Sequence, residues 1–486
     1  MMKQRTLLIS IFLSLVFTIQ LKAQTNKINV EFNANLATYS IVEHLVAEHL
    51  GWLFYIDGKA DIAYLPMAAA ARDEMNKHDN SRIIQQMLDY LKVTGNQQDF
   101  SYHALLRHNT FPDAGYKYSF DGLDIDTAKM KALKTFVENL RRFYIERNLQ
   151  NFFTDYRFFF NGIINEVKQN IPPAYINKME KYYGQSISAY NYYPNPFDVV
   201  PYDTVFWHGN GPIIKTKNGY VASMMTSAYL PLDKKSSIND YSQFGFNHPA
   251  TINTIITHEF GHSFVNPVLE KYERKINESS SLMSDALVNK MGPIGYGNWL
   301  TCIIEHLVRL GEIRIALTNG NAKKADSLRN VYINDFGFVL IPDFEKKIVE
   351  YERNITKYKS FKVFVPTLLT VLDTISVEQV RKKLGLPTEI YSVTINVHVP
   401  KNSGEVFITG NQSAVGNWDP QKIKLNKLSD STLTITFATY ADLKFKFTKG
   451  DWETEGIVEG LEEGKDINPT LMKDTELSYV VLKWKK

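Results

Sequence analysis

The stretch His258-Glu259-Phe260-Gly261-His262 constrains this chain more than any other part of its sequence. It has the pattern H-E-x-x-H. Side chains four positions apart lie on the same face of an α-helix, so both imidazoles can point at one ion. The carboxylate of Glu259 lies one position further round, within reach of a water molecule held by that ion. The stretch therefore predicts a helix that binds a metal ion.

The residues around the motif predict where its helix begins and ends. Pro249 suits the first turn, where its missing N–H is not needed, and isoleucines at helical spacing follow it. Pro267 is expected to prevent the helix from continuing far, so we expect it to run from about Pro249 to Val265. Gly261 is a poor helix former, which indicates close packing at that position.

Length and composition limit the classes of protein to be considered. A chain of 486 residues is expected to form two or three domains. Its 55 basic and 52 acidic residues leave a net charge of +3. This balance gives no case for binding nucleic acid or an anionic membrane surface.

The first residues are typical of a signal peptide. Lys3 and Arg5 precede a largely apolar run from Leu7 to Leu21, and a cleavage site resembling A-x-A ends at Ala23. No later segment reaches the length of a membrane span. The single cysteine, Cys302, excludes internal disulfides. We therefore expect residues 1–23 to be removed and the protein to be periplasmic or secreted in a bacterium.

Periodicity divides the remaining chain into two parts. Residues 24–387 are expected to be α+β, mostly helical with a small sheet before the motif helix. Residues 388–486 read as an all-β sandwich. The expected helices are 82–91, 127–144, 152–167, 299–317, 343–357 and 367–374, and the expected strands are 28–32, 187–190, 204–207, 220–223, 391–400, 406–410, 433–439, 443–448 and 477–484.

The HEFGH core resembles the zinc helix of the zincin metallopeptidases. In that superfamily a small sheet precedes the helix, and its edge strand pairs with a peptide substrate. The resemblance implies a zincin-like fold, a Zn²⁺ cofactor bound by His258 and His262, and a peptide or protein substrate. Residues 1–385 further resemble an uncharacterised zincin-like family of secreted bacterial proteins, in which a Glu-x-x-x-Arg helix follows the HEFGH helix.

Two histidines and a water molecule leave a tetrahedral zinc ion one protein ligand short. The metzincin branch needs Gly and His at positions that are Val265 and Val268 here. The gluzincin branch uses a glutamate from a later helix, and Glu305 fits best. A solvated ion pair with Arg309 is the other interpretation of Glu305. Other acidic residues just past Pro267 are alternative ligands: Glu270, Glu273 and Glu278.

The resemblance also implies a mechanism. Glu259 would act as the general base toward the zinc-activated water and would then protonate the leaving amine. Zincins usually add a Tyr or His donor for the oxyanion. The sequence leaves three candidates for that donor: Tyr296, His208 and Tyr229.

The C-terminal part resembles the starch-binding domain of amylases and glucoamylases. The segments that carry this resemblance are 410–420, 443–447 and 451–453. It implies that Trp418, Lys446 and Trp452 contact an α-glucan or another glycan, with sugar rings stacked on the indoles. That family often has an asparagine shortly after its Trp-Glu pair, which residues 452–457 lack. A spacer or docking domain with structural tryptophans is the alternative.

Two functional classes remain. The first is a secreted zinc metallopeptidase targeted to glycan by its C-terminal domain. The second is a non-catalytic carbohydrate-binding protein with a zincin-like scaffold. The intact Glu259 favours the first, since a site without activity does not need its base. A polysaccharide hydrolase would need paired carboxylates that the sequence does not reveal.

Overall fold

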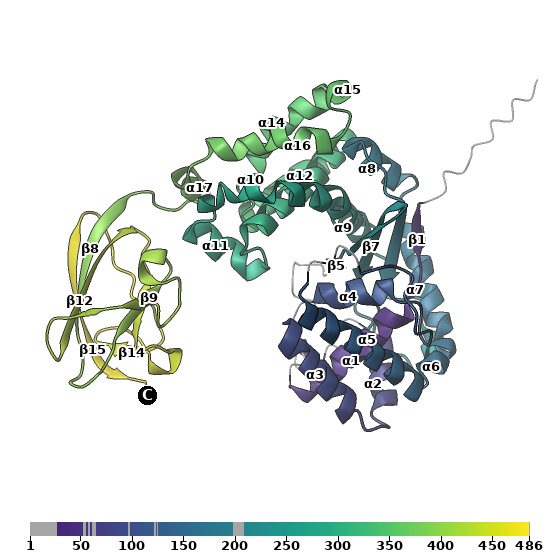
Figure 1. Ribbon diagram of the computed structural model, residues 1–486, viewed down its shortest axis with the longest axis horizontal. Helices are drawn as coiled ribbons and strands as arrows, with labels where there is room; N and C mark the ends of the chain where they lie inside the picture. Colours follow the sequence, from purple (N-terminus) through teal and green to yellow (C-terminus); the bar gives the residue numbers. More distant parts are fainter. Residues whose placement is uncertain are drawn as a thin grey trace, which may run out of the picture.

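The computed structural model describes residues 27–51, 55–56, 59–60, 65–95, 98–120, 123, 125–197 and 209–485. These residues form a mostly helical part with one central sheet, followed by an all-β module (Figure 1). The α+β class is confirmed. One large hydrophobic core extends from Ile28 to Val380 and a second from Val393 to Val481. The expected boundary at residue 387 falls in the segment between these cores.

Most of the first eight helices pack together below the central sheet in Figure 1, whereas the eighth lies above it. Their bounds are α1 Ala34–His49, α2 Pro66–Met75, α3 Ser81–Thr94, α4 Gln98–Arg107, α5 Thr127–Glu146, α6 Leu149–Asp155, α7 Arg157–Asn170 and α8 Tyr175–Tyr183; a short hairpin pairs β2 (Tyr55–Ile56) with β3 (Lys59–Ala60). The single helix expected over residues 152–167 is wrong. The chain breaks at Tyr156 into α6 and α7, whose buried aromatic side chains face the core separately.

The central sheet has the strand order β1-β4-β7-β5, and β6 also pairs with β7. The strands are β1 Ile28–Val30, β4 Ala189–Pro194, β5 Gly209–Asn210, β6 Ile213–Thr216 and β7 Gly219–Thr226. Strands β1, β4 and β7 are parallel to one another, whereas β5 and β6 run antiparallel to β7. The Ser223 N–H donates to the Pro212 carbonyl at 2.9 Å, so β5 and β6 form one edge strand with a break at Gly211 and Pro212.

Helices cover the sheet and continue beyond it. Helix α9 (Pro249–Leu269) packs on the sheet, where the Phe260 ring meets the Tyr190 ring edge-on at 5.1 Å. Helix α12 (Trp299–Thr318) packs against α9. The other helices of this part are α10 Glu273–Asn277, α11 Asp285–Met291, α13 Ala322–Asn330, α14 Ile341–Arg353, α15 Ile355–Tyr358, α16 Phe361–Leu369 and α17 Val377–Lys383.

The expected end of the motif helix is wrong. Helix α9 continues through Pro267 to Leu269. Proline removes one helical hydrogen bond, here to the carbonyl of Ser263. The two residues after it, Val268 and Leu269, are buried in the core, and this packing keeps the last turn helical.

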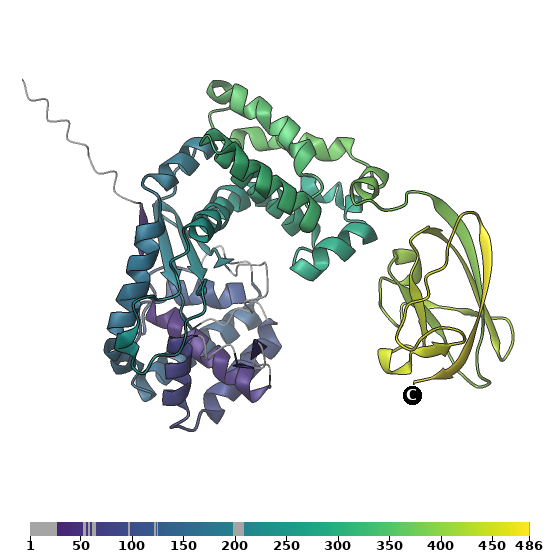
Figure 2. The same cartoon turned by 180° about the vertical axis from the view of Figure 1, so that it is seen from behind.

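The C-terminal module contains two sheets that enclose one core (Figure 2). Their strand orders are β10-β9-β13 and β11-β12-β8-β15-β14. The bounds are β8 Ile390–His398, β9 Phe407–Gly410, β10 Ile423–Lys424, β11 Asn426–Lys427, β12 Thr432–Tyr440, β13 Phe445–Thr448, β14 Gly456–Val458 and β15 Thr475–Trp484. Alternate residues of β8, such as Val393 and Ile395, point into the core. This alternation is the period-two pattern of a sheet with one buried face.

Some of the sequence-based predictions concern residues that the structure does not describe. The signal peptide, the strand at 204–207 and His208 lie outside the described residues. Within the described part, no single helix combines the length and apolarity needed to cross a membrane. One helix pair, Phe361–Thr374 and Val377–Lys383, meets these criteria by length and composition only and is bent by 88° at its break.

Candidate metal centre

The contact between α9 and α12 brings the candidate ligands together. A Cβ atom added to Gly261 on α9 would lie 3.3 Å from the Val308 Cγ1 atom of α12. A Cβ atom added to Gly311 would lie 2.1 Å from the Tyr183 hydroxyl oxygen. Both glycines therefore permit close approach, which is the packing that Gly261 in the motif indicates.

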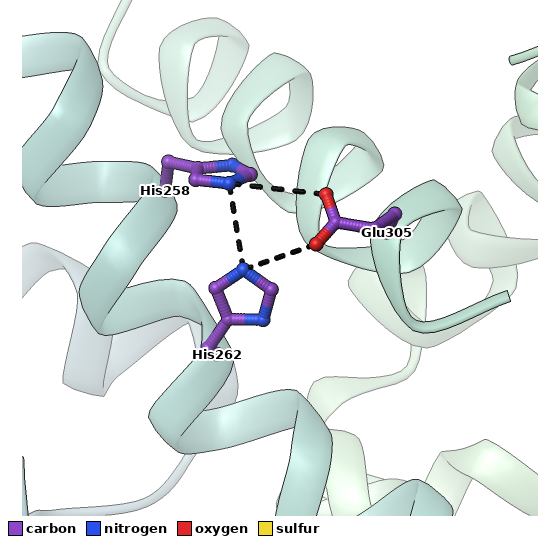
Figure 3. Close-up of side chains that lie close together, drawn as sticks. All are labelled: His258, His262 and Glu305. Carbon is purple, nitrogen blue, oxygen red and sulfur yellow. Dashed lines mark hydrogen bonds and ion pairs between the residues drawn. The ribbon is translucent and has the colours of Figure 1, made fainter. Parts of the chain in front are cut away.

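Three side chains converge between these helices. Figure 3 shows His258 and His262 on one helix, with both imidazoles directed at the Glu305 carboxylate of the neighbouring helix. The distance from His258 Nε2 to His262 Nε2 is 3.4 Å. Glu305 Oε1 lies 3.4 Å from His262 Nε2, and Glu305 Oε2 lies 3.8 Å from His258 Nε2. This group can hold a metal ion.

These distances fit one small cation. Two donors bound to a tetrahedral zinc ion are separated by about 3.4 Å, given zinc–ligand bonds of roughly 2.0–2.1 Å. The Glu305 Oε2 atom is buried and has no hydrogen-bond partner among the described residues. A buried carboxylate oxygen without a partner is costly, and a metal ion would satisfy it. The rival ligands Glu270, Glu273 and Glu278 are not members of this group.

Both imidazoles have a second partner that fixes the ring. The Nδ1 atom of His258 lies 2.9 Å from Glu312 Oε1, and the Nδ1 atom of His262 lies 3.1 Å from Asn266 Oδ1. If each Nδ1–H donates to its oxygen, each Nε2 lone pair points at the other ligands. The Tyr332 hydroxyl, from a π-helical turn over Val331–Asp335, donates to Glu312 Oε2 at 2.6 Å.

Arg309 is buried behind the third ligand. Its Nη2 atom lies 3.6 Å from Glu305 Oε2 and donates to the Tyr296 hydroxyl at 3.3 Å. The guanidinium carbon also lies 4.8 Å from the centroids of the Tyr332 and Phe338 rings. The interpretation of Glu305 and Arg309 as a solvated pair is therefore wrong, because both are buried.

Burial sets the protonation of the centre. It lowers the pKa of His258 well below its usual value, and the Arg309 charge lowers it further. This favours the neutral imidazole that a metal requires. Burial also raises the pKa of Glu312, against the opposing effect of Arg309. Burial, followed by the charge of Glu305, raises the pKa of Tyr296 to about 12, so this phenol keeps its proton near neutral pH.

Glu259 is buried beside the broken edge strand of the sheet. A Cβ atom added to Gly211 would lie 2.9 Å from Glu259 Oε2 and 3.1 Å from its carbonyl oxygen. A side chain at position 211 would therefore meet the carboxylate. Glu259 is outside the group of ligand atoms, and its carboxylate lies against Gly211 at the sheet edge.

The candidate oxyanion donors differ in their surroundings. Tyr229 is buried, and its hydroxyl lies 2.5 Å from the Tyr192 hydroxyl and 2.9 Å from Thr226 Oγ1. Tyr296 accepts a hydrogen bond from Arg309 and interacts electrostatically with both Glu305 and Glu259. Tyr229 also interacts electrostatically with Glu259, so both tyrosines lie near the base, and Tyr296 is the one that also interacts with Glu305 and Arg309.

The predicted sugar-binding residues lie in the C-terminal module. The Trp418 and Trp452 ring centroids are 6.4 Å apart, with 37° between the planes, and 44% of the Trp452 surface is exposed. Lys446 is engaged within the protein, because its Nζ atom lies 2.7 Å from Glu455 Oε1 and 2.6 Å from the Gly464 carbonyl. The two indoles come together, whereas the lysine is held by its neighbours.

Sequence reasoning missed Glu312 and Tyr332. A signal for Glu312 was present, since it lies two helical turns after Glu305 and therefore on the same face of α12. Tyr332 gave no such signal, because a π-helical turn beyond α13 brings it to Glu312. His306, the residue after Glu305, is buried with its Nδ1 atom 2.7 Å from the Cys302 carbonyl oxygen and is not a member of the ligand group.

Residues 113–371 match the family described as Domain of unknown function (DUF4932). This stretch contains α9 and α12 and therefore every residue of the metal centre, but not the C-terminal module. No curated protein matches this sequence. Because the match covers more than half of the 486 residues, the chain belongs to the DUF4932 family.

Proposed function

We propose that this protein is an exported zinc-dependent peptidase. The observation that carries the proposal is the convergence of His258, His262 and Glu305 with donor separations of 3.4–3.8 Å. Two imidazoles and one carboxylate, with a fourth position left for water, form a known donor set of catalytic zinc. The N-terminal residues that resemble a signal peptide support export.

Glu259 supplies the proton transfers in this proposal. When bound, a zinc ion supplies Lewis acidity toward the substrate carbonyl and toward the attacking water. Glu259 accepts a proton from that water as it attacks the peptide carbonyl, and then donates it to the leaving amine nitrogen. Its burial beside Gly211 holds the carboxylate in one place for both steps.

The sheet edge and Tyr296 supply the remaining functions. In this proposal an extended peptide pairs with the backbone of the β5–β6 edge through main-chain hydrogen bonds, which carry no sequence requirement. This edge contains Gly211, the residue next to Glu259. Tyr296 donates its hydroxyl proton to the developing oxyanion, since its oxygen already accepts from Arg309.

The test combines metal content with hydrolysis of an unstructured protein such as casein. Purified wild-type protein should contain about one zinc ion per chain, and His262→Ala should lose it. Glu259→Gln should keep the zinc and reduce hydrolysis by at least about a hundredfold, because only the base is lost. Glu278→Gln, an exposed glutamate beyond α9, serves as the matched control. Zinc-loaded Glu259→Gln with wild-type activity would refute the role of Glu259, and wild-type protein without bound metal would refute the centre.

We also propose that the C-terminal module binds an α-glucan or related glycan and so directs the peptidase to it. The paired indoles of Trp418 and Trp452 support this role, since flat aromatic faces stack on the apolar faces of sugar rings. If the wild-type protein hydrolyses no protein substrate and glycan binding persists, the second functional class, a non-catalytic glycan-binding protein, is favoured.

A further inference from the structure

A cavity of about 440 Å³ lies between the helical part and the C-terminal module. Helix α11 contributes Ala286 and Asn289, and helix α17 contributes Arg381. The module contributes Trp418, Lys444 and Asp466. In Figures 1 and 2, α11 and α17 lie at the end of the helical part that faces the module. The volume of this cavity is within the range of ordinary ligand sites, about 300–1,000 Å³.

Polar contacts hold the two walls of this cavity in register. Asn289 Nδ2 donates to the Asn411 carbonyl at 2.9 Å, and the Ser413 N–H donates to Asp285 Oδ2 at 2.5 Å. Arg381 donates to Asp442 Oδ1 at 2.5 Å. The lining therefore combines amide, carboxylate, ammonium and guanidinium groups with one indole and the apolar side chains of Ala286 and Leu386. This mixture suits a ligand that carries many hydroxyl groups and has apolar ring faces.

Trp418 is held at the cavity in an unfavourable backbone conformation. Its φ angle is +60°, and that of Asn417 is +52°. An aromatic residue is disfavoured in the left-handed region, because its Cβ atom lies too close to the carbonyl oxygen. The hydrogen bond from the Trp418 N–H to the Gly410 carbonyl, 2.8 Å long, helps to fix it there. Such strain concentrates at functional sites, where the fold imposes it.

Lys446 supports this wall instead of contacting the ligand. Its ammonium group is bound by Glu455 and Gly464 and lies 3.7 Å from Asp466 Oδ1. The lysine therefore anchors the loop that brings Asp466 to the cavity. Lys444, two residues earlier on the chain, is exposed and lines the cavity itself.

We propose that this interdomain cavity is the main oligosaccharide site, with a sugar ring stacked on Trp418 and its hydroxyls bound by Asn289, Lys444 and Asp466. This inference rests on the proposed glycan-binding role of the module, and it adds that helix α11 of the metal-binding part completes the site. A bound oligosaccharide consequently contacts both parts of the protein and fixes the module relative to the metal centre.

The test measures binding of maltoheptaose to the full-length protein by calorimetry. Asn289→Trp fills the cavity from α11 and removes the hydrogen bond from Asn289 to the Asn411 carbonyl, and Asn289 is exposed, so the variant should fold. It should weaken binding at least about tenfold because its indole occupies the space of the sugar, and Trp418→Ala should do so because the stacking contact is lost. Asn319→Trp, a change of an exposed asparagine at the end of α12, is the matched control and should bind like the wild type.

The outcomes separate this inference from the proposed function. Wild-type protein that does not bind maltoheptaose refutes the α-glucan role of the module, and the cavity proposal fails with it. Wild-type protein that binds, together with Asn289→Trp that binds equally well, refutes the cavity alone. In that case loss of binding in Trp452→Ala would assign the sugar to the outer face of the two indoles. Unchanged zinc content in every variant shows that the metal-binding part is intact.

Discussion

At the scale of single residues, the metal centre is a balance of buried charges. Glu259, Glu305 and Glu312 are each buried, and Arg309 is the buried cation beside them. When all three carboxylates are ionised, two negative charges remain uncompensated, and one divalent cation balances them. Because an uncompensated buried charge costs several kcal/mol, removal of the metal should destabilise the packing of α9 against α12.

Glu312 should control metal affinity without touching the metal. Glu312→Ala removes the acceptor that orients His258 and should weaken zinc binding by roughly 10–100-fold. Glu312→Gln keeps an acceptor oxygen at the same place, so it should retain more affinity than Glu312→Ala. Competition with a chromophoric chelator measures both constants.

Glu378→Ala, a change of an exposed glutamate on α17, controls for the loss of a carboxylate. Equal zinc affinities for Glu312→Ala and the wild type would contradict this role. Equal affinities for Glu312→Ala and Glu312→Gln would show that the charge of Glu312, and not its hydrogen bond, is what matters.

The sequence predicted the residues of this site to different degrees. His258, Glu259 and His262 are neighbours on one helix, so their spacing alone predicts that they act together. Glu305 was placed by a resemblance and by the need for a third ligand, and the structure brings it to the histidines. The contact of Tyr332 with Glu312 depends on the tertiary fold, so no local sequence pattern predicts it.

At the scale of elements, local patterns located helices better than their ends. The helix expected to begin at Trp299 begins there. Asn298 caps it, because its side chain accepts a hydrogen bond from the Thr301 N–H. Helix α9 begins at Pro249 as expected but continues past Pro267 to Leu269. Capping is a local signal, whereas the end of α9 is decided by the burial of Val268 and Leu269.

The α9–α12 contact should depend on Gly311. A methyl group there would meet the Tyr183 hydroxyl at 2.1 Å, so Gly311→Ala should lower the free energy of unfolding by about 1–3 kcal/mol. It should also weaken zinc binding, because Glu305 and Glu312 move with α12. Denaturant unfolding and the chelator assay measure the two effects.

Two comparisons isolate this contact. Tyr183→Phe combined with Gly311→Ala removes the closest atom and should recover part of the lost stability. A Cβ atom added to Gly297 makes only an ordinary van der Waals contact, 3.4 Å from the Gly292 Cα atom, and the φ angle of Gly297 is not in the left-handed region, so Gly297→Ala should be nearly neutral. A Gly311→Ala variant as stable as Gly297→Ala would show that Tyr183 moves aside without cost.

At the scale of the whole molecule, Arg381 joins the two parts. It is almost fully buried at the end of α17. Its Nε atom donates to the Pro387 carbonyl at 2.7 Å, and its guanidinium carbon lies 3.7 Å from the Tyr440 ring centroid. With the ion pair to Asp442, these contacts connect the last helix, the linker and the module. The proposed interdomain sugar site requires this junction to be ordered.

Arg381→Met should loosen that junction and leave both cores folded. The side chain keeps its apolar stem but loses the ion pair, the hydrogen bond to Pro387 and the charged stacking partner of Tyr440. Since the buried contacts of Arg381 hold the linker closed, trypsin should cut after Lys382 or Lys383 at least about tenfold faster than in the wild type. Arg353→Met changes an exposed arginine at the end of α14 and is the control. Trypsin should cut this variant after Lys382 or Lys383 at the wild-type rate.

Maltoheptaose should slow cleavage of the wild type and protect Arg381→Met less, because a ligand held between α11 and the module stabilises the closed junction. Equal cleavage rates for Arg381→Met and the wild type would mean that the hydrogen bonds of Asn289 and Asp285 with the module hold the two parts together without Arg381.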